Sequence, residues 1–198
     1  MTKYALEQFV WQASLLHPLG EGGKLKLTSD MTELEFAASQ LLASAGGGTG
    51  LGSGGGLTMA DCGESFKALR TFRPMLFFEL AKFSLKESAG DGEGAKLLQA
   101  KSGLDPLVVA HHLLARGSNK AKKNSSVFPW QVLGEDEAGL GKTRQEYLSF
   151  IDKGDARSRA AAMHAMGKCI EKLRSQEQVP VDNNVLQVLD LWVEAHQH

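Results

Sequence analysis

Apolar residues recur at spacings of three and four along most of the chain, the period of a helix that buries one face. In the N-terminal segment Leu6, Phe9, Val10, Ala13 and Leu16 fall on one side of a helix. The same spacing predicts helices over about residues 2–16, 30–45, 58–83, 105–115, 143–153, 155–176 and 182–196. No segment alternates apolar and polar residues for long enough to predict a strand. We therefore expect an all-α fold, a helical bundle or rod segment.

Capping signals support several of the predicted helix starts. A cap residue with an acidic residue three positions later, the capping box, occurs at Asp30 and Glu33, at Thr58 and Asp61, and with a glutamate at Thr143 and Glu146. Asp105-Pro106 supplies a different start, an N-cap followed by proline in the first helical position. These local signals place helix starts at four points along the chain.

A proline falls inside one predicted helix. Pro74 has no N–H to donate to the carbonyl of the preceding turn, and it disfavours helical geometry at Arg73. We expect a bend or a helix break there. The apolar stripe continues across the proline, which predicts one shared core for Phe66, Leu69, Leu76 and Leu80.

Glycine-rich and polar stretches separate the helices. The link at residues 17–29 contains three glycines and is predicted to be a loop. Residues 46–56, GGGTGLGSGGG, have almost no side chain to bury and predict a flexible surface connection. Two further mobile loops are predicted at about 87–103 and 117–141. No composition break divides the chain, so we predict a single α-helical domain over residues 1–198.

Composition narrows the partners that the chain can attract. The 22 basic and 23 acidic residues leave a formal charge of −1, which gives no long-range field for nucleic acid or anionic lipid. The basic RGSNKAKK stretch has no interleaved aromatic residues and is interpreted as a solvated loop. No apolar run approaches 18 residues, so we predict neither a signal peptide nor direct membrane insertion. The cysteines, Cys62 and Cys169, lie far apart and suit a reducing compartment.

One short motif suggests a nucleotide site. Gly141-Lys142-Thr143 resembles the end of a phosphate-binding loop, but Asp136 occupies the position of the first glycine and no buried strand precedes it. The capping box of Thr143 and Glu146 explains the same residues as a helix start. A nucleotide-binding enzyme or switch that uses Gly141, Lys142 and Thr143 is therefore the alternative hypothesis.

No other residues form a site. His111 and His112 are adjacent, so a helix points them about 100° apart and they cannot chelate one ion; we expect them at the core edge and at the surface. The serines lack a placed histidine, and the carboxylates are dispersed. We predict no catalytic, cofactor-binding or metal-binding residues.

Two stretches carry a resemblance to a known family. HPLGEGGKLKLTSDMTELEFA at residues 17–37 and FKALRTFRPMLFF at 66–78 resemble, in order and spacing, the C-terminal region of subunit 5 of the conserved oligomeric Golgi complex. VVAHHLLARG at 108–117 and TRQEYLSFIDK at 143–153 follow in the family's order. The chain departs from the family at Met75, which replaces a leucine, at GSNKAKKNSS, which replaces an Ala-Pro turn, and at the glycine-rich stretch 46–56, which resembles an insertion.

The resemblance implies a structural subunit of a Golgi vesicle-tethering complex, a helical rod without enzymatic activity or cofactor. It implies intra-Golgi retrograde vesicle transport, peripheral attachment to the cytosolic face of the Golgi, and contacts with other subunits, with subunit 7 the expected neighbour and SNARE proteins as further partners. Members of the family are several times longer, so we expect a fragment or a truncated gene model. The stripe of Met163, Met166, Ile170 and Leu173 is a candidate partner surface, although its spacing fits core packing better.

Overall fold

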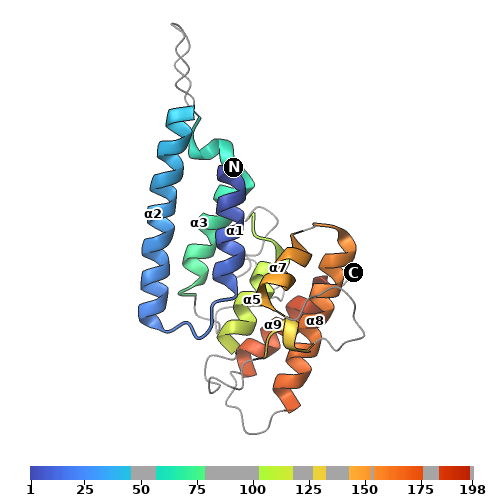
Figure 1. Cartoon of the computed structure of the whole chain (residues 1–198). Coiled ribbons are helices and arrows are strands. Elements are labelled where there is room, and N and C mark those ends of the chain that lie inside the picture. The colour runs from blue at the N-terminus through green and yellow to red at the C-terminus, as the bar shows by residue number, and fades with distance from the viewer. Residues whose placement is uncertain are drawn as a thin grey trace, which may run out of the picture.

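The protein is described by a computed structural model, and every regular element that it describes is a helix (Figure 1). The structure describes residues 1–45, 57–78, 103–117, 127–132, 143–152, 154–175 and 183–196. Its elements are α1 (Thr2–Ser14), α2 (Glu21–Ala45), the 3₁₀ helix η1 (Met59–Cys62), α3 (Glu64–Met75), α5 (Pro106–Gly117), α6 (Pro129–Val132), α7 (Arg144–Ile151), α8 (Ala156–Ser175) and α9 (Asn183–His196). These residues contain no strand, so the predicted all-α fold is confirmed.

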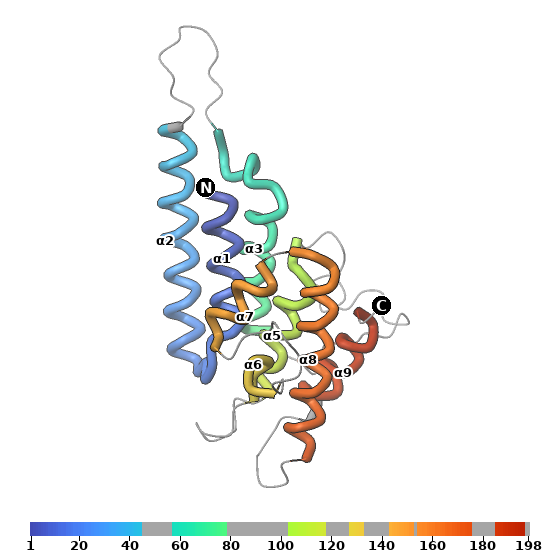
Figure 2. Tube along the Cα trace, turned by 45° about the vertical axis from the view of Figure 1, so that its right-hand side comes forward, coloured from blue at the N-terminus to red at the C-terminus, as the bar shows by residue number. Residues whose placement is uncertain are grey.

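The helices form two groups that meet at α5. In the first group α1, α2 and α3 pack against one another, and in the second α5 packs against α8 and α9 (Figures 1 and 2). Helix α1 also contacts α5, and it thereby joins the two groups. The helix α7 packs on α8, and the short α6 contacts both α7 and α8.

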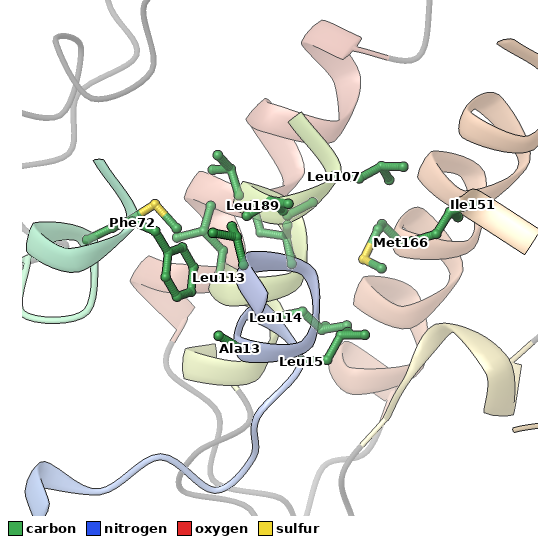
Figure 3. Close-up of a cluster of buried hydrophobic side chains, with 14 of the residues drawn as sticks. Ala13, Leu15, Phe72, Leu107, Leu113, Leu114, Ile151, Met166 and Leu189 are labelled. Atoms are coloured by element: carbon green, nitrogen blue, oxygen red, sulfur yellow. The ribbon is translucent and has the colours of Figure 1, made fainter. Parts of the chain in front are cut away.

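Helix α5 lies at the centre of the core. Every residue from Leu107 to Ala115 is buried, so the helix has no face toward solvent. Figure 3 shows Leu107, Leu113 and Leu114 of α5 among side chains from α1, α3, α7, α8 and α9. A helix that is apolar on all sides is stable only when other elements surround it, and here helices from both groups do so.

The link predicted at residues 17–29 is wrong over most of its length, because α2 begins at Glu21 and includes Gly22 and Gly23. Asp30 is therefore not a cap. It lies inside the helix, where its carboxylate pairs with Lys26 one turn earlier. Glycine weakens a helix relative to alanine, by about 1 kcal/mol in a helix interior, and these two glycines lie in the first turn of α2. Burial of Leu27 and Met31 on the inner face offsets that cost, because each removes a large apolar side chain from water.

The predicted break at Pro74 coincides with the end of α3. The helix ends at Met75, one residue after the proline, and Leu69 and Leu76 are both fully buried. Phe66 packs partly buried against the same core, while Leu80 lies outside the described residues. Helix α3 is tied to α2 by Arg73, whose Nη2 atom lies 3.1 Å from Oε1 of Glu35.

The remaining helices follow the sequence closely. Helices α7, α8 and α9 match the predicted segments to within a few residues. Within the connection predicted at 117–141, the structure describes Gly117 and residues 127–132, which include α6 and the buried Val127. The rest of that connection, the predicted loop at 46–56, and 87–103 except for Gly103 lie outside the described residues.

Candidate functional site

Thr143 acts as a helix cap. Its hydroxyl accepts a hydrogen bond from the backbone N–H of Glu146 at 3.2 Å, and the Glu146 carboxylate accepts one from the Thr143 N–H at 3.0 Å. This is the predicted capping box at the start of α7. Gly141 and Lys142 lie outside the described residues. The one described residue of the motif is thus engaged in starting a helix.

The placement predicted for His111 and His112 at the core edge and surface is wrong: both side chains are only 1% exposed. The physical reason is the central position of α5, which has neighbours on every side. Adjacent residues on a helix point about 100° apart, so the two imidazoles address different helices. His111 meets α1 and α7, and His112 meets α3.

His111 links three helices through a buried polar chain. Its Nε2 atom lies 2.7 Å from the Tyr147 hydroxyl on α7, and its Nδ1 atom lies 3.4 Å from the Ser14 hydroxyl on α1. Ser14 donates its own proton to the carbonyl of Trp11 at 2.8 Å. The serine oxygen is then the acceptor for Nδ1–H, which leaves Nε2 to accept from Tyr147. This assignment gives every member of the chain a partner.

The hydrogen-bonded set of Ser14, His111 and Tyr147 stays uncharged. Burial lowers the pKa of His111 to about 3 and raises the pKa of Tyr147 well above its usual value. A serine beside a histidine resembles part of a catalytic triad, but the two ring nitrogens of this histidine contact Ser14 and Tyr147 and neither contacts a carboxylate of the described residues. The serine proton points at a backbone carbonyl. His111 and Tyr147 are both buried in the described part of the chain, where their contacts position α1, α5 and α7 relative to one another.

His112 and Arg116 donate hydrogen bonds to the C-terminal end of α3. The Met75 carbonyl, in the last turn of α3, accepts hydrogen bonds from His112 Nε2 at 3.2 Å and from Arg116 Nη1 at 3.4 Å. Carbonyls at a helix end have no intrahelical partner, so donors from another helix satisfy them. Burial and the nearby Arg116 charge lower the pKa of His112 to about 3. The two adjacent histidines therefore fasten α5 to both α1 and α3.

A hollow of about 270 Å³ opens where α5 and α8 begin and α9 ends. Its apolar lining includes Leu107 and Met163, and its rim carries the ion pair of Asp105 with Arg159. The Asp105 carboxylate also accepts the Leu107 N–H at 2.9 Å, as the predicted cap of α5 requires. The two charged groups are engaged with each other, and His196, which also lines the hollow, has its Nδ1 atom 2.8 Å from the Trp192 carbonyl.

The described part of the chain shows no group of histidine, cysteine, aspartate and glutamate side chains that could hold a metal ion. Cys62 and Cys169 are buried free thiols, and burial raises the pKa of the Cys169 thiol, which makes it unreactive. Among the described helices, none is long and apolar enough to cross a membrane.

The candidate partner stripe on α8 belongs to the core. Met163, Met166, Ile170 and Leu173 are all buried within this one chain. Met166 and Ile151 appear together in the packed cluster of Figure 3. The stripe is therefore core filling, as its spacing indicated, and it cannot also face a partner while the bundle is intact.

Two curated proteins share sequence with the chain. Conserved oligomeric Golgi complex subunit 5 of Arabidopsis thaliana is 31% identical over 120 residues, which cover 61% of this chain and 11% of the plant protein. Conserved oligomeric Golgi complex subunit 5 of Mus musculus is 40% identical over 73 residues, 37% of this chain and 7% of the mouse protein. The chain is related to subunit 5 of the conserved oligomeric Golgi complex.

The relationship covers a small part of that subunit, because the chain spans about a tenth of the length of the curated relatives that it matches. No family model and no solved structure matches the chain. The predicted resemblance to subunit 5 is thus confirmed by the comparisons at the level of sequence. Sequence reasoning missed the buried Ser14, His111 and Tyr147 chain, since its members lie 97 and 36 residues apart.

Proposed function

We propose that the chain is a structural module of a Golgi vesicle-tethering complex and acts through contacts with other proteins. The observation that carries this proposal is the sequence relationship to Golgi complex subunit 5 in a plant and a mammal. The finer parts of the proposal are a role in intra-Golgi retrograde vesicle transport and attachment to the cytosolic face of the Golgi. Subunit 7 is the proposed neighbour in the complex, and SNARE proteins are proposed further partners.

The chemistry of the described residues supports a role without catalysis. His111, His112 and Tyr147, three polar groups whose pKa values are strongly shifted by burial, are buried and join helices. Perturbed groups at active sites face a cleft that substrate can enter, and these face other helices. A helical module that keeps its fold and exposes its surface to other proteins fits a structural role in a tethering complex.

The test is to express the tagged 198-residue chain in cells that contain or lack subunit 7. We expect the chain to co-purify with complex subunits and to reach the Golgi only when they are present. Cells that lack an unrelated Golgi protein are the control. Golgi localisation that survives the loss of the complex subunits would overturn the proposal.

A second arm separates protein contact from lipid contact. The purified chain is mixed with liposomes that contain anionic lipid and is then sedimented. With a formal charge of −1 the chain gains little from anionic lipid, so we expect it to stay in the supernatant. Tight liposome binding would replace the tethering proposal with direct membrane attachment.

A further inference from the structure

Helix α2 presents a second apolar stripe that no described element covers. Its inner face packs on α1, η1 and α3 and buries Leu27, Met31, Ala38 and Leu42. The opposite face looks away from the molecule, at the outer edge of the bundle in both views (Figures 1 and 2). That outer face carries Leu25 and Phe36, whose exposed fractions are 64% and 63%.

The outer stripe has strict heptad spacing and no charge. Steps of three and four alternate without interruption through Gly22, Leu25, Ser29, Thr32, Phe36, Ser39 and Ala43. A repeat of this kind brings one seam of a helix into register with a partner helix. Charged residues of the outer face, Lys26 and Glu33, flank the seam, while the seam itself holds Leu25 and Phe36 among small and hydroxyl residues, so a partner helix can cover it without burying a charge.

The three hydroxyl groups in this stripe have partners within α2. Ser29 lies 3.5 Å from a Glu33 carboxylate oxygen, and the other two donate to backbone carbonyls. Thr32 donates to the Thr28 carbonyl at 3.0 Å, and Ser39 donates to the Phe36 carbonyl at 2.7 Å. Burying a polar group costs most when its hydrogen bond is lost. Since these hydroxyls keep their partners when another helix covers them, the stripe can be desolvated at small cost.

The stripe is complementary to itself when two copies run antiparallel. In that arrangement a step forward along one helix corresponds to a step backward along the other. When Ser29 of one copy faces Thr32 of the other, Leu25 therefore faces Phe36. The same register brings Lys26, beside Leu25, near Glu33, beside Thr32, on the opposite helix, in addition to the Asp30 carboxylate that Lys26 contacts within its own helix. Lys26 and Glu33 lie on the same edge of the stripe, so the dimer would contain two Lys26–Glu33 pairs related by the two-fold axis.

We infer that the outer face of α2 is an antiparallel homodimer interface, in which α2 of a second copy is the occupant. Leu25 and Phe36 form the two apolar contacts of this interface, and Lys26 with Glu33 fixes the register. The contact uses one helix and two large side chains from each copy, so it is a weak, reversible association of the transient class. It is independent of the tethering proposal because it needs no other protein.

Sedimentation velocity on the purified 198-residue chain, from about 1 to about 300 µM, tests the association directly. We expect a monomer–dimer equilibrium whose dissociation constant rises about tenfold or more in Leu25→Glu and in Phe36→Glu. Leu191→Glu is the matched control, because Leu191 is an exposed leucine on α9 and should leave the equilibrium unchanged. Circular dichroism confirms that each variant keeps its helices.

Charge exchange and cross-linking test the register. Lys26→Glu and Glu33→Lys should each weaken the dimer, and the two changes together should restore it. Under oxidation the double variant Leu25→Cys with Phe36→Cys should form a covalent dimer, whereas Leu25→Cys alone should not, because the two copies of position 25 lie about 16 Å apart along the axis. The native thiols are buried and do not interfere.

A chain that remains monomeric over the whole concentration range would overturn the inference. Association that is insensitive to both glutamate variants would also overturn it, by placing the contact on another face. Efficient cross-linking of Leu25→Cys alone would show parallel pairing and would refute the antiparallel arrangement.

Discussion

Tyr147 shows how much one hydroxyl group can matter inside a helical core. The side chain is fully buried, and its O–H is the donor that satisfies His111 Nε2 at 2.7 Å. A buried acceptor without a partner costs more than the hydrogen bond is worth when formed, because the group has lost water as well. The residue is therefore needed for the histidine as much as for its own packing.

Replacing Tyr147 with phenylalanine should lower the free energy of unfolding by about 1 to 3 kcal/mol, since His111 is left buried with an unsatisfied nitrogen. Tyr4→Phe is the matched control, because the Tyr4 hydroxyl contacts Asp152 at an exposed position. Urea unfolding of both variants provides the measurement. Equal stability of Tyr147→Phe and the parent chain would refute the assigned network.

Leu69 is a buried position at which the core formed by the Phe-Arg-Pro segment can be tested. Truncation to alanine should cost about 2 to 5 kcal/mol, because a fully buried side chain is removed and a cavity remains. The exposed Leu191, truncated in the same way on α9, should change stability little. A loss below about 0.5 kcal/mol at Leu69 would contradict its burial. Thermal or urea unfolding of the two variants gives the comparison.

At the scale of single elements, local capping signals predicted three helix starts correctly, at Thr58, Asp105 and Thr143, and one wrongly, at Asp30. The capping box of Thr143 and Glu146 lies within four consecutive residues, and the structure reproduces it. The start of α2 was misplaced because Gly22 and Gly23 weaken a helix locally, while the burial that stabilises it depends on α1 and α3. Local sequence does not reveal a tertiary contact of that kind.

Removing the cap at Thr143 should cost about 1 kcal/mol of stability in Thr143→Ala, since the N–H of Glu146 loses its acceptor. Lys142→Ala should change neither stability nor any binding of ATP, which we expect to be absent. Urea unfolding and an equilibrium nucleotide titration measure the two effects. An ATPase activity that disappears in Lys142→Ala would revive the nucleotide hypothesis.

For the whole molecule, sequence predicted the helix content but not the arrangement of the helices. Apolar periodicity identifies a buried face without saying which helix covers it, and the run from Leu107 to Leu114 has no periodic apolar stripe to orient it because every residue in it is buried. The two histidines in that run suggested solvent, although neighbours enclose them. Only the assembled bundle reveals that His111 forms hydrogen bonds with α1 and α7 while His112 forms one with α3.

The stability of the bundle should fall as the pH is lowered from 7. Both histidines have a pKa of about 3 in the folded chain, below the value of 6.5 expected when it is unfolded. The unfolded chain therefore binds more protons below pH 6.5. The stabilisation is fully present above that pH and is lost toward pH 3, at about 1.4 kcal/mol per pH unit for each histidine.

Urea unfolding between about pH 7 and pH 5.5 isolates this effect, because most carboxylates stay ionised there. His111→Gln should reduce the slope of stability against pH by about half, since one of the two buried histidines is gone. His164→Gln, at an exposed position on α8, should leave the slope unchanged. A parent chain with the same stability at both ends of that range would contradict the neutral burial of the pair.

The all-round enclosure of α5 has a consequence for how the molecule opens. Its backbone amides reach solvent only when helices on several sides separate together, so their hydrogen exchange should require the full free energy of unfolding. Helix α2 is held along one face and can exchange after a smaller opening that leaves the second group intact. Exchange followed by mass spectrometry should therefore divide the chain into two cooperative units, with α5 the last segment to acquire deuterium.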